Sequence, residues 1–176
     1  MNAEVLRRAA VVRLALFDVD GVLTDGGLVL GSDAAEFKTF HVHDGLGLVM
    51  LLQAGMEVGV ISARPSTVVT ERMQALGVKH VALGVDNKAA EFKRILGQLH
   101  LTADQAAFVG DDLVDLAPMA LAGLSVAVAD AQPLVRARAH WVTDRNGGRG
   151  AVREVCELLL RAQGRLDSAY KNYLAP

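Results

Sequence analysis

The chain has 176 residues, 52% of them hydrophobic and 22% charged, so it can bury a core of its own and does not have the composition of a disordered protein. Its 18 basic and 20 acidic residues give a net charge of −2, which excludes an electrostatic basis for binding nucleic acid. One cysteine, Cys156, excludes an internal disulfide framework and suits a reducing compartment. We therefore expect a single cytoplasmic domain over residues 1–176, and no apolar run has the length of a membrane span.

Short apolar runs alternate with amphipathic segments in the first half of the chain. Residues 11–17 predict a buried strand that ends at Asp18. Residues 26–40 alternate polar and apolar side chains around a turn near Ser32, which predicts a β-hairpin. The elements expected next are a helix over 45–54, a strand over 57–61, a helix over 66–76 and a short strand over 80–83.

The second half repeats this alternation. Its expected elements are a helix over 88–100, a strand over 106–109, a helix over 113–122, strands over 125–129 and 140–143, a helix over 150–162 and a polar tail to residue 176. Strands that alternate with helices predict an α/β fold of three layers, in which helices cover both faces of a parallel sheet. Such sheets bind their ligands beyond the carboxyl ends of the strands.

Polar residues of one chemical kind follow three of the predicted strands. Asp18 and Asp20 follow the first, Ser62 follows the second, and Asp111 with Asp112 follows the fourth. Carboxylates gathered at one edge of a sheet repel each other unless a cation neutralises them. Oxygen ligands without a cluster of histidine or cysteine favour Mg²⁺.

Phosphoryl transfer gives each of these residues a task. Asp18, the first polar residue after the strand, is the candidate nucleophile for an aspartyl-phosphate. Asp20 is placed to protonate the leaving alcohol and then to deprotonate water. The Ser62 hydroxyl and the Lys88 ammonium can bind the phosphoryl oxygens, on which negative charge accumulates.

Four segments in order carry a resemblance to a known superfamily. Residues 18–26 (DVDGVLTDG), 61–64 (ISAR), Lys88 and 110–115 (GDDLVD) resemble the four motifs of the haloacid dehalogenase superfamily. A finer similarity, to its 3-deoxy-D-manno-octulosonate 8-phosphate phosphatase family, is carried by residues 40–47 (FHVHDGLG), 124–130 (LSVAVAD) and 147–154 (GGRGAVRE). The resemblance covers roughly residues 11–166 and implies a Rossmann-like fold.

The resemblance also implies roles for individual residues. Asp18 is then nucleophile and metal ligand, Asp20 binds Mg²⁺ through its backbone carbonyl, and Asp111 is the third ligand. It implies that Asp112 and Asp115 hold waters or orient Lys88. The candidate substrate contacts are Asp20, His41, Val42, His43, Asp44, Gly45, Arg64, Arg72, Lys88 and Arg149. From the residues alone, Arg72 fits a surface charge equally well, and Asp115 fits a helix-surface carboxylate.

Members of this superfamily usually carry an inserted cap domain, for which this chain has no room. Only the short hairpin follows the first strand, and one helix and one strand fit between Ser62 and Lys88. An uncovered site would be wet and unselective, so a neighbouring subunit is expected to cover it. The resemblance implies a homotetramer joined through the hairpin. The loop of residues 147–150 and the C-terminal tail, which follows the helix expected to begin at residue 150, could complete the site.

The expected reaction is the hydrolysis of 3-deoxy-D-manno-octulosonate 8-phosphate, a small phosphorylated sugar acid, to the free sugar acid and phosphate in lipopolysaccharide biosynthesis. A phosphatase of a nine-carbon 2-keto sugar acid 9-phosphate is the near alternative. A non-catalytic receiver-like module that binds phosphate is an alternative of another class. The Asp18 and Asp20 pair argues against a receiver, which usually lacks a second acid to protonate a leaving group.

Overall fold

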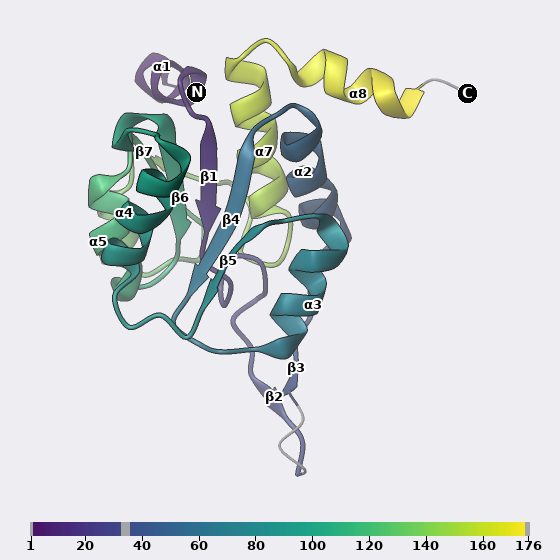
Figure 1. Ribbon diagram of the computed structural model, residues 1–176, viewed down its shortest axis with the longest axis vertical. Coiled ribbons are helices and arrows are strands. Elements are labelled where there is room, and N and C mark those ends of the chain that lie inside the picture. Colours follow the sequence, from purple (N-terminus) through teal and green to yellow (C-terminus); the bar gives the residue numbers. More distant parts are fainter. Residues whose placement is uncertain (1, 33–35, 175–176) are drawn as a thin grey trace.

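The computed structural model describes residues 2–32 and 36–174, and its centre is a parallel sheet (Figure 1). Six strands lie in the order β5-β4-β1-β6-β7-β8, and all neighbouring pairs are parallel. Their bounds are β1 Leu14–Phe17, β4 Glu57–Ser62, β5 His80–Leu83, β6 Ala106–Gly110, β7 Leu124–Ala127 and β8 Trp141–Val142.

Strand β1 lies in the middle of the sheet because its four residues, Leu-Ala-Leu-Phe, are apolar on both faces and fully buried. Phe17 at its end is level with Val60 of β4 and Val109 of β6. The chain first builds the sheet outward from β1 through β4 and β5, then returns to build the other side from β6. Strand order therefore reverses at β1, which creates a crevice beyond its carboxyl end, where Asp18 follows.

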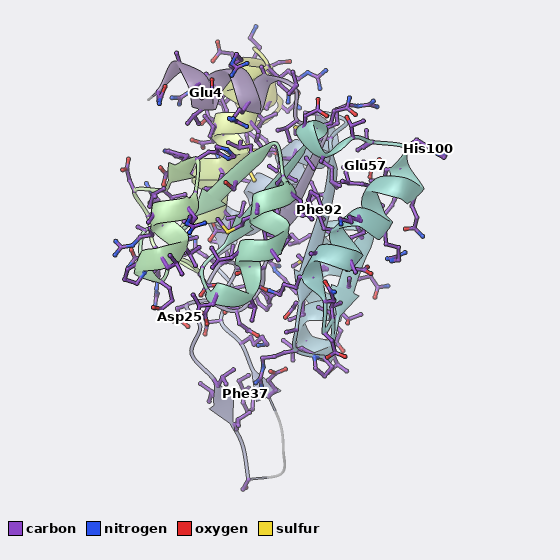
Figure 2. The ribbon with its side chains drawn as sticks, turned by 90° about the vertical axis from the view of Figure 1, so that its left-hand side faces the viewer. Glu4, Asp25, Phe37, Glu57, Phe92 and His100 are labelled. Atoms are coloured by element: carbon purple, nitrogen blue, oxygen red, sulfur yellow. The ribbon has the colours of Figure 1, made fainter. Side chains whose placement is uncertain are left out.

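Helices cover both faces of the sheet, as the sequence predicts (Figure 1). Helices α2 (Val42–Gln53), α3 (Thr67–Leu76) and α7 (Ala151–Ala162) lie on one face, and α4 (Lys88–Leu99) and α5 (Leu116–Leu121) lie on the other. Short 3₁₀ turns η1 (Ala103–Gln105) and η2 (Leu113–Asp115) precede β6 and α5. Phe92 of α4, labelled in Figure 2, packs edge-to-face on Phe108 of β6 with ring centroids 6.3 Å apart.

Three helices lie where the sequence analysis predicted none. Helix α1 (Ala3–Ala10) is capped by the Asn2 side chain and buries Val5 and Ala9. Helix α6 (Pro133–Arg138) begins with proline at its first position. Helix α8 (Leu166–Leu174) replaces the predicted polar tail and lies with α1 at the end of the molecule opposite the hairpin (Figure 1). Through Leu174, the tail therefore does not cover the crevice of its own chain.

The predicted hairpin is present and protrudes from the carboxyl edge of the sheet, although its paired part is shorter than residues 26–40. Strands β2 (Val29–Leu30) and β3 (Glu36–Phe37) pair antiparallel, and residues 33–35, beside the predicted turn, lie outside the described residues. Phe37 lies on the hairpin away from the body of the protein (Figure 2) and is 60% exposed. Among the described residues, no helix is both long enough and apolar enough to cross a membrane.

Candidate active site

The loop that follows β1 carries the candidate nucleophile and is closed by a buried hydroxyl. The Asp18 backbone N–H donates to the Val109 carbonyl at 2.9 Å, which continues the parallel pairing up to this residue. The Thr24 hydroxyl accepts from the backbone N–H groups of Gly21 at 3.4 Å and Gly26 at 3.2 Å. These bonds close a tight turn, and Gly21 adopts a φ of 92° that favours glycine.

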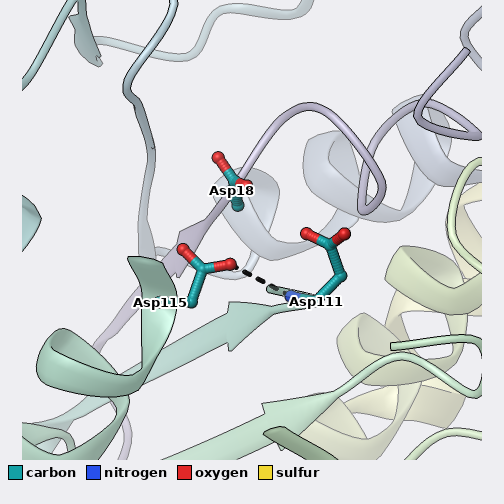
Figure 3. A group of neighbouring side chains, drawn as sticks. All are labelled: Asp18, Asp111 and Asp115. Carbon is teal, nitrogen blue, oxygen red and sulfur yellow. Dashed lines mark hydrogen bonds between the residues drawn. The ribbon is translucent and has the colours of Figure 1, made fainter. Parts of the chain in front are cut away.

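Three carboxylates converge at the carboxyl edge of the sheet (Figure 3). Asp18, Asp111 and Asp115 each offer one oxygen, and these atoms lie within 4.8 Å of one another. Asp111 Oδ1 is the one buried side-chain polar atom that has no hydrogen-bond partner among the described residues. A buried oxygen without a partner is costly unless a cation or water satisfies it.

A buried lysine partly neutralises this cluster. Lys88 Nζ lies 2.7 Å from Asp18 Oδ1 and 2.7 Å from Asp115 Oδ1. The second oxygen of Asp115 accepts from the backbone N–H groups of Asp111 at 3.0 Å and Asp112 at 3.3 Å. Because these contacts occupy both oxygens of Asp115, its carboxylate orients Lys88 and the backbone around Asp111. Asp112 is exposed and accepts from the Leu113 N–H at 2.7 Å.

One ammonium group does not balance the negative charge of this cluster. Burial, and next the Asp115 carboxylate, raise the pKa of Asp18 to about 7, although Lys88 opposes the change. Burial, followed by the charges of Asp18 and Asp115, raises the pKa of Asp111 to about 8. Hard oxygen donors, an unpartnered buried oxygen and uncompensated negative charge together fit a divalent cation such as Mg²⁺, which the side chains of Asp18 and Asp111 could hold.

A cleft of about 190 Å³ opens onto these groups. The Asp20 and Arg64 side chains also line it, as does Ser62, whose hydroxyl accepts from the Arg64 backbone N–H at 3.2 Å. That bond leaves the Ser62 hydroxyl proton free to donate to a bound oxyanion. The structure therefore brings together the candidates Asp18, Asp20, Ser62, Arg64, Lys88, Asp111 and Asp112 around one cleft.

The candidate contacts from His41 to Gly45 lie at the start of helix α2, which begins at Val42 and not at the predicted residue 45. His41 caps helix α2, and Val42, His43, Asp44 and Gly45 form its first turn. Asp44 is fully buried, and its carboxylate accepts from the backbone N–H groups of Gly150 at 3.1 Å and Arg153 at 2.7 Å. It therefore caps the start of α7, 106 residues away in sequence, and its oxygens are occupied by the backbone.

The remaining candidates from this region also lie outside the cleft. His43 lines a separate hollow of about 450 Å³ beside Arg153 and Glu157. Arg72 packs against Gly45, and its guanidinium carbon lies 6.0 Å from the centre of the Phe40 ring. Neither residue lines the acidic cleft in this structure.

The glycine-rich loop before α7 lies against the loop of the nucleophile. Gly148 donates its N–H to the Val22 carbonyl at 2.9 Å, and the Arg149 guanidinium lies 3.1 Å from the Asp25 carboxylate. The backbone of Gly147 approaches the Gly21 carbonyl so closely that a Cβ would collide with it. Gly110 has the same relation to the Asp115 side chain. Both glycines thus make room for the site by having no side chain.

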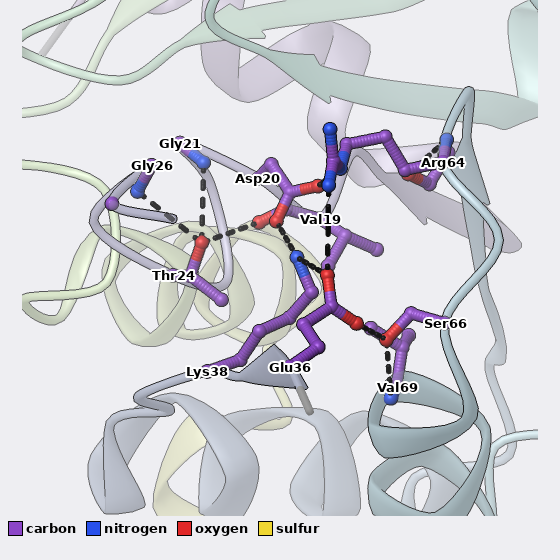
Figure 4. Close-up of polar contacts among 12 residues, drawn as sticks. Val19, Asp20, Gly21, Thr24, Gly26, Glu36, Lys38, Arg64, Ser66 and Val69 are labelled. Atoms are coloured by element: carbon purple, nitrogen blue, oxygen red, sulfur yellow. Dashed lines mark hydrogen bonds and ion pairs between the residues drawn. The ribbon is translucent and has the colours of Figure 1, made fainter. Parts of the chain in front are cut away.

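Two hairpin residues that the sequence analysis did not select touch the site (Figure 4). Lys38 forms an ion pair with the Asp20 carboxylate, and Glu36 accepts from the Ser66 hydroxyl at 2.6 Å. Side chains alternate along a strand, so Glu36 and Lys38 share the face opposite to the exposed Phe37. That charged pair, beside an apolar residue at the base of the hairpin, is the sequence feature that could have revealed them.

Comparisons with known proteins agree with this geometry. A haloacid dehalogenase-like hydrolase family matches residues 81–155. The 3-deoxy-D-manno-octulosonate 8-phosphate phosphatase KdsC of Escherichia coli (strain K12) is 47% identical over 169 residues, which cover 96% of this chain and 90% of that protein.

Solved structures give the same result. The 3-deoxy-D-manno-octulosonate 8-phosphate phosphatase of Yersinia pestis superposes with a TM-score of 0.94 at 43% identity, over 95% of this chain and 90% of that one. The phosphatase of the same name from Moraxella catarrhalis, in complex with magnesium, phosphate and KDO, superposes with a TM-score of 0.96 at 36% identity, over 98% of this chain and 99% of that one. The chain therefore belongs to the 3-deoxy-D-manno-octulosonate 8-phosphate phosphatase family of haloacid dehalogenase-like hydrolases, as its motifs predicted.

Proposed function

We propose that this protein is a magnesium-dependent phosphatase that hydrolyses 3-deoxy-D-manno-octulosonate 8-phosphate through an aspartyl-phosphate on Asp18. The observation that carries the proposal is the unpartnered Asp111 oxygen beside the Asp18 carboxylate and the Lys88 ammonium. The substrate is inferred from the relatives that are named 3-deoxy-D-manno-octulosonate 8-phosphate phosphatase. The one from Moraxella catarrhalis was solved with both magnesium and KDO. The product is a sugar acid used in lipopolysaccharide synthesis.

In the first half of the reaction, an Asp18 oxygen attacks phosphorus and the bond to the sugar oxygen breaks. Lys88, 2.7 Å from Asp18 Oδ1, holds the nucleophile in place and can reach the phosphoryl oxygens. Ser62 donates its free hydroxyl proton to the same oxygens. Asp20, at the rim of the cleft, gives its proton to the departing sugar oxygen.

In the second half, water hydrolyses the aspartyl-phosphate. Asp20 has lost its proton to the sugar and now takes one from the attacking water, so a single carboxyl group serves both halves. Asp18 and Asp111 would hold Mg²⁺ with their side chains, and Asp20 with its backbone carbonyl. When bound, Mg²⁺ supplies positive charge that offsets the repulsion between carboxylates and phosphate.

We expect phosphate release from the eight-carbon sugar acid phosphate to require Mg²⁺. Dialysis against a chelator should abolish it, and added Mg²⁺ should restore it, because no cationic side chain in the described part of the protein pairs with Asp111 Oδ1. The measurement is phosphate release from the eight-carbon 8-phosphate and the nine-carbon 9-phosphate, assayed in parallel. Faster turnover of the nine-carbon substrate would reassign the function, and full activity in metal-free buffer would refute the role of the metal.

We further infer that the hairpin joins subunits into a homotetramer of capless single-domain chains, in the cytoplasm, where a protein with one free cysteine is expected. Leu28, Val29, Leu30 and Phe37 are 49%, 60%, 65% and 60% exposed on a hairpin that is too small to bury them. Phe40, the last residue of the segment predicted to form the hairpin, instead packs against the core. A second copy of the chain is the expected partner, because in a closed symmetric oligomer the same apolar patch on two subunits can be buried in one interface.

A double variant tests this assembly. Leu28→Glu with Phe37→Lys places charges in the proposed interface and should shift the mass measured by light scattering from tetramer to monomer. Turnover of the sugar acid phosphate should fall more than turnover of a small aryl phosphate, because hydrolysis of the small ester does not depend on a neighbouring subunit that covers the site. Val11→Glu with Leu134→Lys is the matched control, since these residues are 51% and 48% exposed elsewhere. A fully active wild-type monomer would contradict the proposal.

A further inference from the structure

Lys38, at the base of the hairpin, has a buried side chain that ends beside carboxylates. Its side chain is 1% exposed, and its Nζ forms ion pairs with Asp20 Oδ1 and, at 3.3 Å, with Glu36 Oε1. A buried lysine is rare unless carboxylates compensate its charge. The fold therefore places an ammonium in direct contact with the carboxyl group that is proposed to exchange protons with the substrate.

The Asp20 side chain is held from two sides by this arrangement (Figure 4). Lys38 contacts Oδ1, while Arg64 Nε lies 3.7 Å from Oδ2 and belongs to a side chain that is 46% exposed. Arg64 is open to solvent, so its ion pair is screened and contributes little orientation. Lys38 is the buried contact, and it therefore determines the direction of the Asp20 carboxylate more than Arg64 does.

Lys38 is itself fixed by a chain of contacts. Glu36 contacts the ammonium through Oε1, and its Oε2 accepts from the Ser66 hydroxyl at 2.6 Å. The same Ser66 hydroxyl accepts from the Val69 N–H at 3.3 Å and so caps helix α3. The position of Asp20 is thus linked through the hairpin to a helix that packs on the sheet.

We propose that Lys38 is the positioning residue for Asp20 in the phosphatase reaction. This inference rests on the proposed function, in which Asp20 protonates the leaving sugar oxygen and deprotonates water. A general acid must lie within hydrogen-bond reach of the atom it protonates, and displacement by 1 Å costs about 10²-fold in rate. Without Lys38, the Asp20 side chain keeps only the exposed Arg64 as a cation and rotates away from the cleft.

The test compares leaving groups that differ in their need for a proton. Lys38→Met should lower kcat on the sugar acid phosphate by about 10²-fold, with a smaller change in KM. With p-nitrophenyl phosphate, whose leaving group departs without a proton, the first turnover should stay within about threefold of wild type. Later turnovers should be slow, because water attack still needs Asp20, so nitrophenolate should appear as a burst.

Further variants separate positioning from a general loss of structure. Lys38→Arg should recover part of the rate, since it restores a cation, and Lys79→Met, at an exposed lysine, is the matched control. Adding Lys38→Met to Asp20→Asn should cause no further loss, because the group that Lys38 positions is already absent. Should Lys38→Met fail to fold, Glu36→Gln provides the same test, with a smaller loss of kcat and the same burst.

Two results would overturn the positioning role. One is an equal loss in the first turnover for both esters, and the other is the same fold-loss from Lys38→Met in the Asp20→Asn background as in wild type. Failure of the proposed function is a separate result. It would be seen in the wild-type protein, which would then release no phosphate from the sugar acid phosphate with Mg²⁺ present, before any variant is made.

Discussion

Replacing Asp18 with asparagine is expected to reduce phosphate release by about five orders of magnitude or more. Asparagine has nearly the same shape, but its amide is a poor nucleophile and cannot form the acyl-phosphate bond. The change also removes one partner of Lys88, which keeps its contact with Asp115 at 2.7 Å, so the fold should survive. The measurement is steady-state turnover together with mass spectrometry of acid-quenched protein, in which a phosphorylated peptide containing Asp18 appears only for the wild type.

The control for this experiment is Asp104→Asn, an exposed aspartate in the turn η1 at the opposite edge of the sheet. It should have wild-type turnover and wild-type labelling. Asp20→Asn provides a second comparison, because it retains the nucleophile and loses only the acid-base group, which is typically worth about 10²–10⁴-fold. Near wild-type turnover by Asp18→Asn, or label on another residue, would show that Asp18 is not the nucleophile.

Replacing Asp111 with asparagine should abolish magnesium-dependent turnover and at the same time stabilise the metal-free protein. The Asp111 oxygen is buried without a partner, and its pKa is raised to about 8, so the ionised group destabilises the folded chain. Asp111 is open to the cleft on one side, and we therefore expect a gain of only about 2 kcal/mol at pH 8, or about 4–8 °C in Tm. Thermal unfolding in the presence of a chelator measures this gain.

The pH dependence of this gain has a defined sign. In the unfolded chain an aspartate has a pKa of about 3.9, whereas the pKa of Asp18 is about 7 and that of Asp111 is about 8 in the fold. Below pH 4 the two aspartates are protonated in both the folded and the unfolded chain, so they do not change the stability of the fold. Between pH 4 and pH 8 the unfolded chain gives up these protons first, so the metal-free protein becomes less stable as pH rises. Asp111→Asn should flatten this dependence.

Added Mg²⁺ gives the complementary measurement. The wild-type Tm should rise with Mg²⁺, most strongly near pH 8, because metal binding releases the protons that Asp18 and Asp111 still hold at lower pH. Asp111→Asn should lose most of this shift, whereas the control Asp104→Asn should keep it. If Asp111→Asn were less stable than wild type in chelator at pH 8, the view of Asp111 as a destabilising metal ligand would be wrong.

The sheet and the acidic cluster could be predicted because local sequence patterns encode them. The apolar run before Asp18 identifies the central strand, and the alternation of strands with helices gives the parallel sheet, both of which are confirmed. Parallel strands bring their carboxyl ends to one edge, so Asp18 and Asp111 come together although they are far apart in sequence. The family similarity predicted from the motifs is confirmed as well.

The misses have physical causes. Helix α1 has only 8 residues, of which Val5 and Ala9 are buried, so the sequence offers little more than two helical turns on which to base a prediction. The capping role of Asp44 was not predicted, because the groups it caps lie in α7, more than 100 residues later, and no local pattern contains that information. Lys38 was missed because its partner Asp20 belongs to another segment, and only the return of the hairpin to the body brings the two charges together.

The close contacts of Gly110 and Gly147 affect how tolerance to substitution should be interpreted in this protein. Neither residue has a side chain that could take part in chemistry, yet the Asp115 side chain and the Gly21 carbonyl occupy the space that any Cβ would need. A saturation scan scored by growth would therefore rank these two positions beside Asp18. Intolerance at Asp18 would report a lost reaction, whereas intolerance at the glycines would report crowding, and only assays on purified protein would tell the two apart.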